Sequence, residues 1–478
     1  MNVRMIKFIL YQVMRIEGVL MLLPSLVSII YGDHEGFYYI GVAAFLIIAG
    51  FIGCRFKPKH QTINVKEGYV ATGLSWIIMS LFGCLPIYMS GEIDSFTDAV
   101  FEIVSGFTTT GASILHEVET LSHTALFWRS FTHWIGGMGV LVFLLALIPM
   151  SGGSNINLMK AESPGPSVGK LVPKMRYTAI ILYLIYVVMT LVETILLICG
   201  GLNLFDSLCL AFGTAGTGGF AVRNDSFMSY SLYIRWVVGV FMILFGVNFN
   251  AYYFILMRQF KKVFCFEEVR VFICIVLIST GIVFAKILPM YEGGVTALTD
   301  AFFQVASVVS TTGYCSADFD LWPAASKFVL CFLMFMGACA GSTGGGVKVS
   351  RLIILWKSVV KEVQSYIHPK IVKKVTMDKK PISNDVLKST HVFLATYAGI
   401  FLLSMLVVSF DNHDMTTTFT SVLATLNNIG PGLSMVGATC NYAFFSAVSK
   451  WTLIFDMLAG RLELFPMIIL FAPSLYKK

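Results

Sequence analysis

The segment SGFTTTGAS at residues 105–113 sets three threonines beside a glycine, and related segments follow it in three later places. These are GTAGTGGFA at 213–221, SVVSTTGYC at 307–315 and LNNIGPGLS at 426–434. One glycine in each segment serves as a reference: Gly111, Gly219, Gly313 and Gly430. The residues thirteen positions before them are Asp98, Asp206, Asp300 and Thr417. Acidic and hydroxyl residues stabilise the first turn of a helix, where backbone amides lack partners. The pattern therefore predicts four short helices of about two to three turns, each ended by a glycine-rich turn.

The composition indicates the solvent in which these helices lie. Of 478 residues, 56% are hydrophobic and 13% are charged, and the mean hydropathy is +0.78. A soluble protein carries roughly 25% charged residues, so this chain cannot cover itself with a water-exposed surface. The class is a polytopic membrane protein. Its ten cysteines form no CxxC pair, which argues against a zinc site or a disulfide framework.

Ten apolar runs are long enough to cross roughly 30 Å of hydrocarbon as helices. They lie near residues 8–30, 37–54, 69–90, 126–150, 178–200, 232–257, 268–289, 327–357, 389–410 and 448–473. The four glycine segments fall between the third and fourth, fifth and sixth, seventh and eighth, and ninth and tenth runs. Each is too short to cross, so all four are interpreted as re-entrant.

Loop charge predicts the orientation. Lysine and arginine gather in the loops at 55–66, 160–176, 258–270 and 357–388, whereas the alternate loops are acidic. By the positive-inside rule both termini are cytoplasmic and the re-entrant segments face outward. The net charge of +7 is then a topology signal, with membrane lipid rather than nucleic acid as its partner.

The expected fold is an all-α polytopic membrane protein built from four repeats. Each repeat is an M1–P–M2 unit: an outer helix, a re-entrant pore helix and an inner helix around a central pore. The spacings between the segment glycines are 108, 94 and 117 residues. The expected organisation is an N-terminal two-helix region at 1–60, followed by repeats at 61–158, 159–262, 263–375 and 376–478.

The re-entrant turns have the features of a cation filter. Non-helical backbone survives at membrane depth only where it is buried in protein or lines a watery cavity. Four such turns can converge on one axis, where carbonyl oxygens replace the water shell of an ion. The residues expected there are Thr110, Gly111, Gly218, Gly219, Thr312, Gly313, Ile429 and Gly430. The preceding helices would aim their negative C-terminal ends at this axis, which favours a cation. The alternative is that the glycines only allow close helix packing, but four at a common offset favour the filter.

A second glycine cluster interrupts the run at 327–357. It comprises Gly341, Ser342, Thr343, Gly344, Gly345 and Gly346. Each glycine costs a helix about 1 kcal/mol relative to alanine, so we expect a break at mid-membrane that acts as a movable plug. A packing kink is the alternative. A phosphate cradle is disfavoured because no GK[ST] follows.

Arg461 lies near the middle of the last run, where a charge costs several kcal/mol unless it faces a cavity or a partner. It points into the pore and repels cations, or forms a salt bridge with Asp456 or Glu463, and the two roles can coexist. Glu193 is a candidate coupling site or a hydrogen-bonded carboxylate between helices. His133 is expected to be a hydrogen-bonded packing residue.

Five long strings carry a family resemblance. They are FWRSFTHWIGGMGVLV at 127–142, AESPGP at 161–166, ACAGSTGGGVKVSR at 338–351, TLNNIGPG at 425–432 and LAGRLELF at 458–465. With them the chain resembles the bacterial Trk/Ktr/HKT superfamily of potassium transporters, and most closely its TrkH-type translocating subunits. The second and third glycine segments depart mildly from the family pattern.

The resemblance implies a homodimeric potassium uptake channel of the bacterial inner membrane. Its filter glycines would be Gly111, Gly219, Gly313 and Gly430, and Arg461 would match the family's pore arginine. K⁺ would be the transported ion, with no other cofactor. A cytosolic nucleotide-binding regulatory subunit, a TrkA-like ring, would be the partner.

Competing functions remain open at this point. The nearest is a Na⁺-permeable carrier or a K⁺/Na⁺ or K⁺/H⁺ symporter on the same fold. An intramembrane serine protease using Ser342 needs a histidine or lysine base near that serine, and no spacing supplies one. A purely structural or receptor-like protein would leave the four glycine turns unexplained. The chain has no ATP-binding motif, so a nucleotide-binding subunit would dock on the basic loops at 151–176 and 348–388, unless those charges only bind lipid.

Overall fold

The computed structural model describes the chain apart from residues 57, 59–62, 140–174, 370–373 and 476–478. The end of the predicted crossing at 126–150, the repeat boundary at 158–159, the AESPGP string and most of the basic loop at 151–176 lie outside the described residues. The regular secondary structure of the described chain is helical except for one two-stranded ribbon, β1 (Thr376–Met377) with β2 (Lys380–Pro381).

Within the described residues, six of the ten predicted crossings are helical segments long and apolar enough to cross a membrane. They are α1 (Val3–Leu20) with α2 (Leu22–Tyr31), α3 (Gly36–Cys54), α4 (Val65–Gly83) with α5 (Leu85–Met89), α10 (Met175–Cys199), α15 (Glu267–Ile287) and α19 (Asn384–Val408). These helices confirm that the chain is a multi-pass membrane protein.

The four predicted short helices are present. They are α6 (Phe96–Phe107), α11 (Leu204–Gly216), α16 (Gly294–Val309) and α20 (Met415–Leu426). With 12 to 16 residues they are longer than expected.

The residues expected to begin these helices do so in three cases of four. Asp98, Asp206 and Thr417 lie in the first turn, and their amides donate to the N-cap side chains Ser95, Asn203 and Asp414. The prediction is wrong for Asp300, because α16 begins six residues earlier. Asp300 instead pairs with Arg235 at 2.9 Å.

In the described residues, the helices at the other four predicted crossings, which follow the short helices, are short or interrupted. Helix α7 (His123–Gly137) ends after 15 residues. Helices α12 (Leu232–Gly246) and α13 (Phe249–Leu256) meet at a bend of 92°. Further along, α17 (Ala324–Met336) is separated from α18 (Val349–Ile367), and α21 (Ala447–Arg461) from α22 (Phe465–Leu470). The run at 327–357 breaks where its glycines predicted a break.

The short and broken helices pack in a cyclic order. Each broken helix contacts the short helix before it and also the next one along: α7 with α11, α12 with α16, α17 with α20, and α21 with α6. The last of these contacts joins the C-terminal quarter to the first, which closes the circle. The pair Lys450–Asp98, at 2.6 Å, bridges that closing contact.

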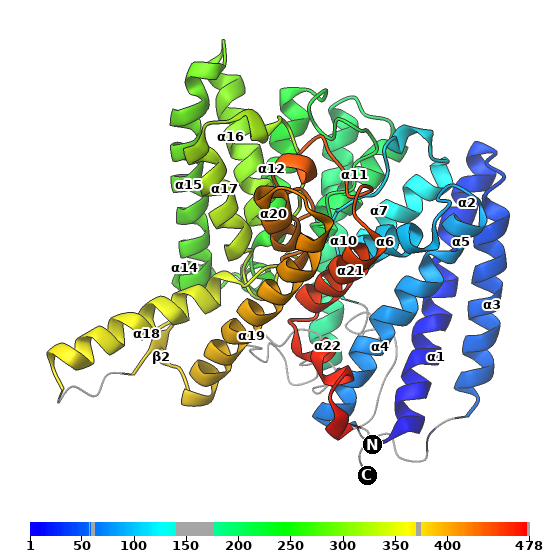
Figure 1. Ribbon diagram of the computed structural model, residues 1–478, viewed down its shortest axis with the longest axis horizontal. Coiled ribbons are helices and arrows are strands. Elements are labelled where there is room, and N and C mark those ends of the chain that lie inside the picture. Colours follow the sequence, from blue (N-terminus) through cyan, green and yellow to red (C-terminus); the bar gives the residue numbers. More distant parts are fainter. Residues whose placement is uncertain (57, 59–62, 140–174, 370–373, 476–478) are drawn as a thin grey trace.

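The remaining helices surround this centre (Figure 1). Helices α1, α2 and α3 form a block at one side, in contact with α4 and α7. On the opposite side α18 extends away from the bundle, beyond α14 (Phe260–Cys265) and α15. Helix α1 begins and α22 ends at the same end of the molecule.

Candidate functional site

The four glycine turns share one backbone conformation. The glycine of each turn has a positive φ, as does the residue two places before it. The glycine values are 78° at Gly111, 88° at Gly219, 85° at Gly313 and 94° at Gly430; the earlier residues are Thr109, Thr217, Thr311 and Asn428, at 54–60°. Glycine adopts this left-handed region without the clash that a Cβ would cause.

The four turns also touch one another in a closed ring. A Cβ placed on Gly111 would lie 2.1 Å from the carbonyl oxygen of Gly218. A Cβ on Gly219 would lie 2.2 Å from the carbonyl oxygen of Thr312, and a Cβ on Gly313 would lie 1.9 Å from that of Ile429.

The ring is completed by the fourth glycine, since a Cβ on Gly430 would lie 2.7 Å from the oxygen of Thr110. All eight residues expected in the filter are therefore brought together. The four glycines also line a single cavity, together with Arg129 and Tyr442 among other residues.

Hydrogen bonds from outside the ring hold its backbone. Tyr442 Oη donates to the carbonyl oxygen of Gly430 at 2.7 Å. His133 links the end of α6 to the second turn: Nδ1 is 2.7 Å from the oxygen of Gly106, and Nε2 accepts from Phe220 N at 3.2 Å. Donation by Nδ1 and acceptance by Nε2 fit one neutral tautomer. The expectation of a hydrogen-bonded packing histidine is confirmed.

The segment at 337–348, between α17 and α18, is attached to the bend between α12 and α13. Phe249 N donates to Gly341 O at 3.0 Å, and Thr343 Oγ1 donates to Phe245 O at 3.2 Å. These bonds satisfy backbone groups that the two helix breaks leave free.

The same segment lies against the third and fourth turns. Gly345 N donates to Thr311 Oγ1 at 2.6 Å. A Cβ on Gly345 would lie 2.6 Å from Asn427 O. Five of the six expected gate glycines and hydroxyls, Gly341, Ser342, Gly344, Gly345 and Gly346, line a second cavity with Arg461.

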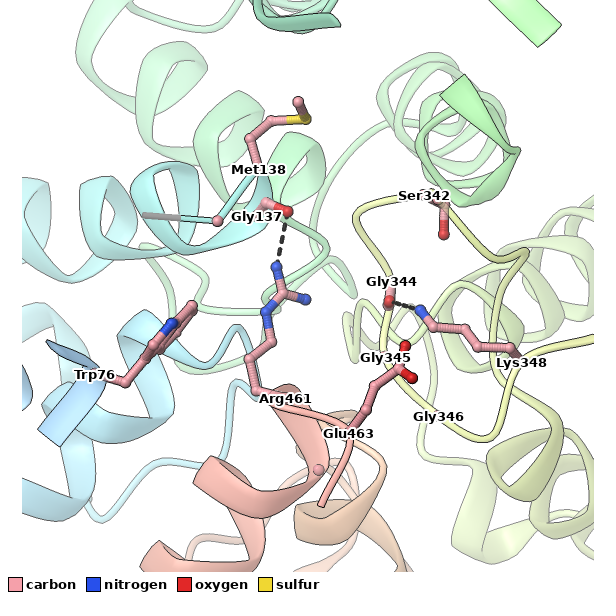
Figure 2. Close-up of a pocket in the computed structure, with 13 residues that line it drawn as sticks. Trp76, Gly137, Met138, Ser342, Gly344, Gly345, Gly346, Lys348, Arg461 and Glu463 are labelled. Atoms are coloured by element: carbon pink, nitrogen blue, oxygen red, sulfur yellow. Dashed lines mark hydrogen bonds between the residues drawn. The ribbon is translucent and has the colours of Figure 1, made fainter. Parts of the chain in front are cut away.

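Arg461 joins this segment to the end of α7 (Figure 2). Its Nη1 donates to Thr343 O at 2.7 Å, and its Nη2 donates to Gly136 O at 2.5 Å and Gly137 O at 2.7 Å. The guanidinium faces the second cavity. Of the two acids suggested as salt-bridge partners, Asp456 accepts from Ser404 and Glu463 pairs with Arg351.

Three functional neighbours were not predicted from the sequence. Lys348 lines the second cavity and donates to Gly344 O. Glu268 accepts from Ala340 N at 2.7 Å and from Ser350 N at 3.1 Å, so it ties the segment to the first turn of α18. Arg129 pairs with Glu102 behind the first turn. In the sequence, Glu268 is recognisable only as an acid at the start of an apolar helix. Its partners lie 72 and 82 residues away, so no local pattern predicts the contact.

The described part of the chain contains no group of three or more His, Cys, Asp or Glu residues that could hold a metal ion. Glu193 is fully buried in α10.

The described part of the chain combines six apolar crossings with a closed ring of carbonyl-bearing turns, a pattern typical of a multi-pass membrane protein of the ion-transport class. A family model named TrkH and described as "Cation transport protein" matches residues 37–477. The chain belongs to the TrkH family, which confirms the family resemblance of its sequence. This is a family of transporters and not of enzymes, so the protease alternative does not stand.

The individual relatives cover nearly the whole chain. It is 34% identical over 471 residues to the Trk system potassium uptake protein TrkH of Salmonella typhimurium, with 96% of each chain covered. It is 30% identical to TrkG of Escherichia coli, covering 95% of this chain and 94% of that one. The crystal structure of the potassium transporter TrkH from Vibrio parahaemolyticus matches all of both chains with a TM-score of 0.90 and 30% identity.

Proposed function

We propose that this chain is the potassium-translocating subunit of a Trk-type uptake system and that K⁺ passes through the ring of four glycine turns. The observation that carries the proposal is the cyclic approach of each turn to the carbonyl of the next. Carbonyl oxygens in such a ring can replace the water shell of a cation. The C-terminal ends of α6, α11, α16 and α20 precede the turns and add a negative potential there.

The cyclic packing of short and broken helices supports four M1–P–M2 repeats. Their bounds are 61–158, 159–262, 263–375 and 376–478, with residues 1–60 outside the repeat. The lysine and arginine bias of the loops supports a bacterial inner-membrane orientation with both termini cytoplasmic. Inward K⁺ flow can then use the membrane potential, worth about 2.3 kcal/mol per charge per 100 mV.

The proposed gate is the segment 341–346 together with Arg461. It lies against the third and fourth turns, and the arginine bonds hold it to α7. A cation leaving the ring would meet both the segment and a guanidinium charge. Opening therefore requires the segment to leave Arg461 and Thr311.

The proposal includes a regulatory partner on the cytoplasmic side of the protein. The relatives are named as parts of a Trk system, and nucleotide control would come from a separate TrkA-like subunit. Its docking site would include the basic segment 348–388, in which α18 extends from the bundle. We propose a homodimer of this chain as the membrane unit. The relatives named above are potassium transporters, which does not favour the sodium-permeable or ion-coupled alternative.

Isotope uptake tests the proposed ion. Purified protein in liposomes, with a potassium gradient directed outward, should accumulate radioactive rubidium much faster than radioactive sodium. Liposomes lacking the protein provide the background. Equal uptake of the two isotopes would contradict a potassium pathway.

A further inference from the structure

Three of the four ring turns are tied to their own short helix at one equivalent place. The amide three residues after the ring glycine donates to a side chain of the preceding helix. These bonds are Ile114 N to Glu102 Oε2 at 3.0 Å, Ser316 N to Gln304 Oε1 at 3.4 Å and Leu433 N to Thr420 Oγ1 at 3.0 Å. Glu102 and Gln304 both stand nine residues before their glycine, and Thr420 stands ten before. All three side chains are buried.

The first of these ties is ionic. Glu102 Oε1 accepts from Arg129 Nε at 2.9 Å and from Arg129 Nη2 at 2.7 Å, and it also accepts from Ser113 Oγ at 3.0 Å. Neither Glu102 nor Arg129 is more than 2% exposed. A buried ion pair is tolerated when further hydrogen bonds satisfy its oxygens, and here both carboxylate oxygens accept bonds.

The same pair reaches the second turn. The Arg129 guanidinium lies 4.1 Å from the centre of the Phe220 ring, within the range of a cation–π contact. Phe220 directly follows Gly219, a ring glycine. One buried pair thus contacts the first turn through Glu102 and the second through Arg129.

We propose that Glu102 and Arg129 form an ionic brace that positions the first ring turn against the second, and so contributes to the discrimination between K⁺ and Na⁺. Gln304 and Thr420 are the neutral braces of the third and fourth turns. The inference rests on the proposed function of the ring as the K⁺ path.

Backbone bonds such as Thr110 N to Ser105 O at 2.9 Å fasten the start of each turn to its short helix. The physical reason for a brace is that the part of the turn beyond the ring glycine is held by the side-chain bonds described above. Na⁺ is smaller than K⁺ and needs its oxygen ligands closer. A ring braced from behind resists that contraction, whereas a loosened ring can close around Na⁺. Arg129 also lines the cavity at the ring, so the Glu102 carboxylate offsets a positive charge beside the ion path.

Glu102→Gln tests the brace with little change in shape. The amide oxygen can still accept from Ile114 N, but the ion pair is lost. We expect the K⁺/Na⁺ permeability ratio from bilayer reversal potentials to fall about tenfold, which corresponds to about 1.4 kcal/mol, near the lower end for a hydrogen bond to a charged group. K⁺ flux should fall as well, because the Arg129 charge is left uncompensated.

Adding Arg129→Gln separates the charge effect from positioning. The double variant should recover flux, since the uncompensated charge is gone, while the permeability ratio stays low. An unchanged ratio in both variants, at normal membrane levels, would overturn the brace.

Thr420→Val and Gln304→Leu test the same idea without disturbing an ion pair. If the Glu102 variants do not reach normal levels in the membrane, these two variants test the brace in their place. Each removes the acceptor for one turn amide, and each should lower the permeability ratio. Wild-type ratios in both, with normal thermal stability, would overturn the proposal.

Two further variants keep this inference distinct from the proposed function. Glu92→Gln is the matched control, because Glu92 accepts from Ser122 N at 2.8 Å and is not among the residues that line the cavity at the ring; its ratio should equal that of the wild type. Gly313→Ser changes the ring itself. A ratio altered by Gly313→Ser but not by the brace variants would refute the brace alone, and no effect from any of them would refute both.

Discussion

Glycine is required at the four ring positions because of what lies opposite each Cα. Two constraints coincide there: a left-handed φ, and a carbonyl oxygen of the next turn less than 3 Å from where a Cβ would be. Two glycines elsewhere in the chain carry neither constraint. Gly41 and Gly399 lie in long helices, and a Cβ on either would meet nothing within 4 Å.

At Arg461 a single side chain holds three backbone carbonyls from two separate segments. Arg461→Gln removes the charge and most of these bonds. We expect higher K⁺ flux at low driving force, because both the electrostatic barrier and the hold on Thr343 are weakened. Isotope uptake at a series of membrane potentials measures this.

Lys7→Gln is the control for that experiment, since Lys7 is an exposed cation on α1. It should leave flux unchanged. Reduced flux in a normally folded Arg461→Gln protein would contradict the gate and favour a purely structural arginine.

At the scale of elements, the segment 337–348 is fixed by contacts of its glycines as well as by Arg461. Gly345→Ala places a methyl group 2.6 Å from Asn427 O, so the segment must move away from the fourth turn. Single-channel recording should show a raised open probability. Gly281→Ala, with no atom within 4 Å of the added methyl group, is the control. An unchanged open time in Gly345→Ala would contradict the role of the segment as a plug.

The short helix α20 depends on its N-cap. Asp414 accepts from Thr417 N at 2.9 Å and from Thr417 Oγ1, and the side-chain bond is the main reason why its pKa lies below the ordinary value. Asp414→Ala should cost about 1 kcal/mol of stability, seen as a lower unfolding temperature in detergent.

The pH dependence of this cap has a definite sign. Because the folded pKa is depressed, the stabilisation is present above the unfolded pKa of about 3.9 and is lost as pH falls through the folded pKa. The difference between wild type and Asp414→Ala should therefore shrink below about pH 4. A difference independent of pH would contradict ionic capping. Asp414→Asn keeps an acceptor at this position and should lose less stability at neutral pH than Asp414→Ala does.

The elements that the sequence predicted well are those set by local rules. Turn glycines with left-handed φ, first-turn polar residues and long apolar runs are all visible within about a dozen residues. The breaks after α12 and α21 were missed, although Asn248 caps α13 and Pro466 stands in the first turn of α22. Contacts such as Gly345 with Thr311, or Glu268 with Ala340, join distant parts of the chain and leave no local pattern.

At the scale of the whole molecule, closure of the helix circle depends on contacts between its first and last quarters. Lys450 of α21 pairs with Asp98 of α6, and the lysine is 9% exposed. Breaking a buried pair by removing one partner costs about 3–5 kcal/mol, and less where a partner is partly exposed, as Asp98 is. Asp98→Asn should therefore lower the unfolding temperature measurably.

A charge exchange tests whether that loss belongs to the pair. Asp98→Lys and Lys450→Asp should each destabilise, and the double variant should recover part of the loss. Strictly additive losses would contradict a direct interaction across the closing contact. Asp385, an acid in the first turn of α19 away from this contact, offers a control when changed to Asn.

The central claim is that K⁺ passes through the ring in which four turns from four quarters of the chain meet. The most direct measurement is the reversal potential in a planar bilayer with K⁺ on one side and Na⁺ on the other, for the wild type and for Gly111, Gly219, Gly313 and Gly430 each changed singly to Ser. The account predicts a potential close to the K⁺ equilibrium value for the wild type and a shift toward zero for every one of the four variants. Wild-type potentials and conductances in the variants would contradict it.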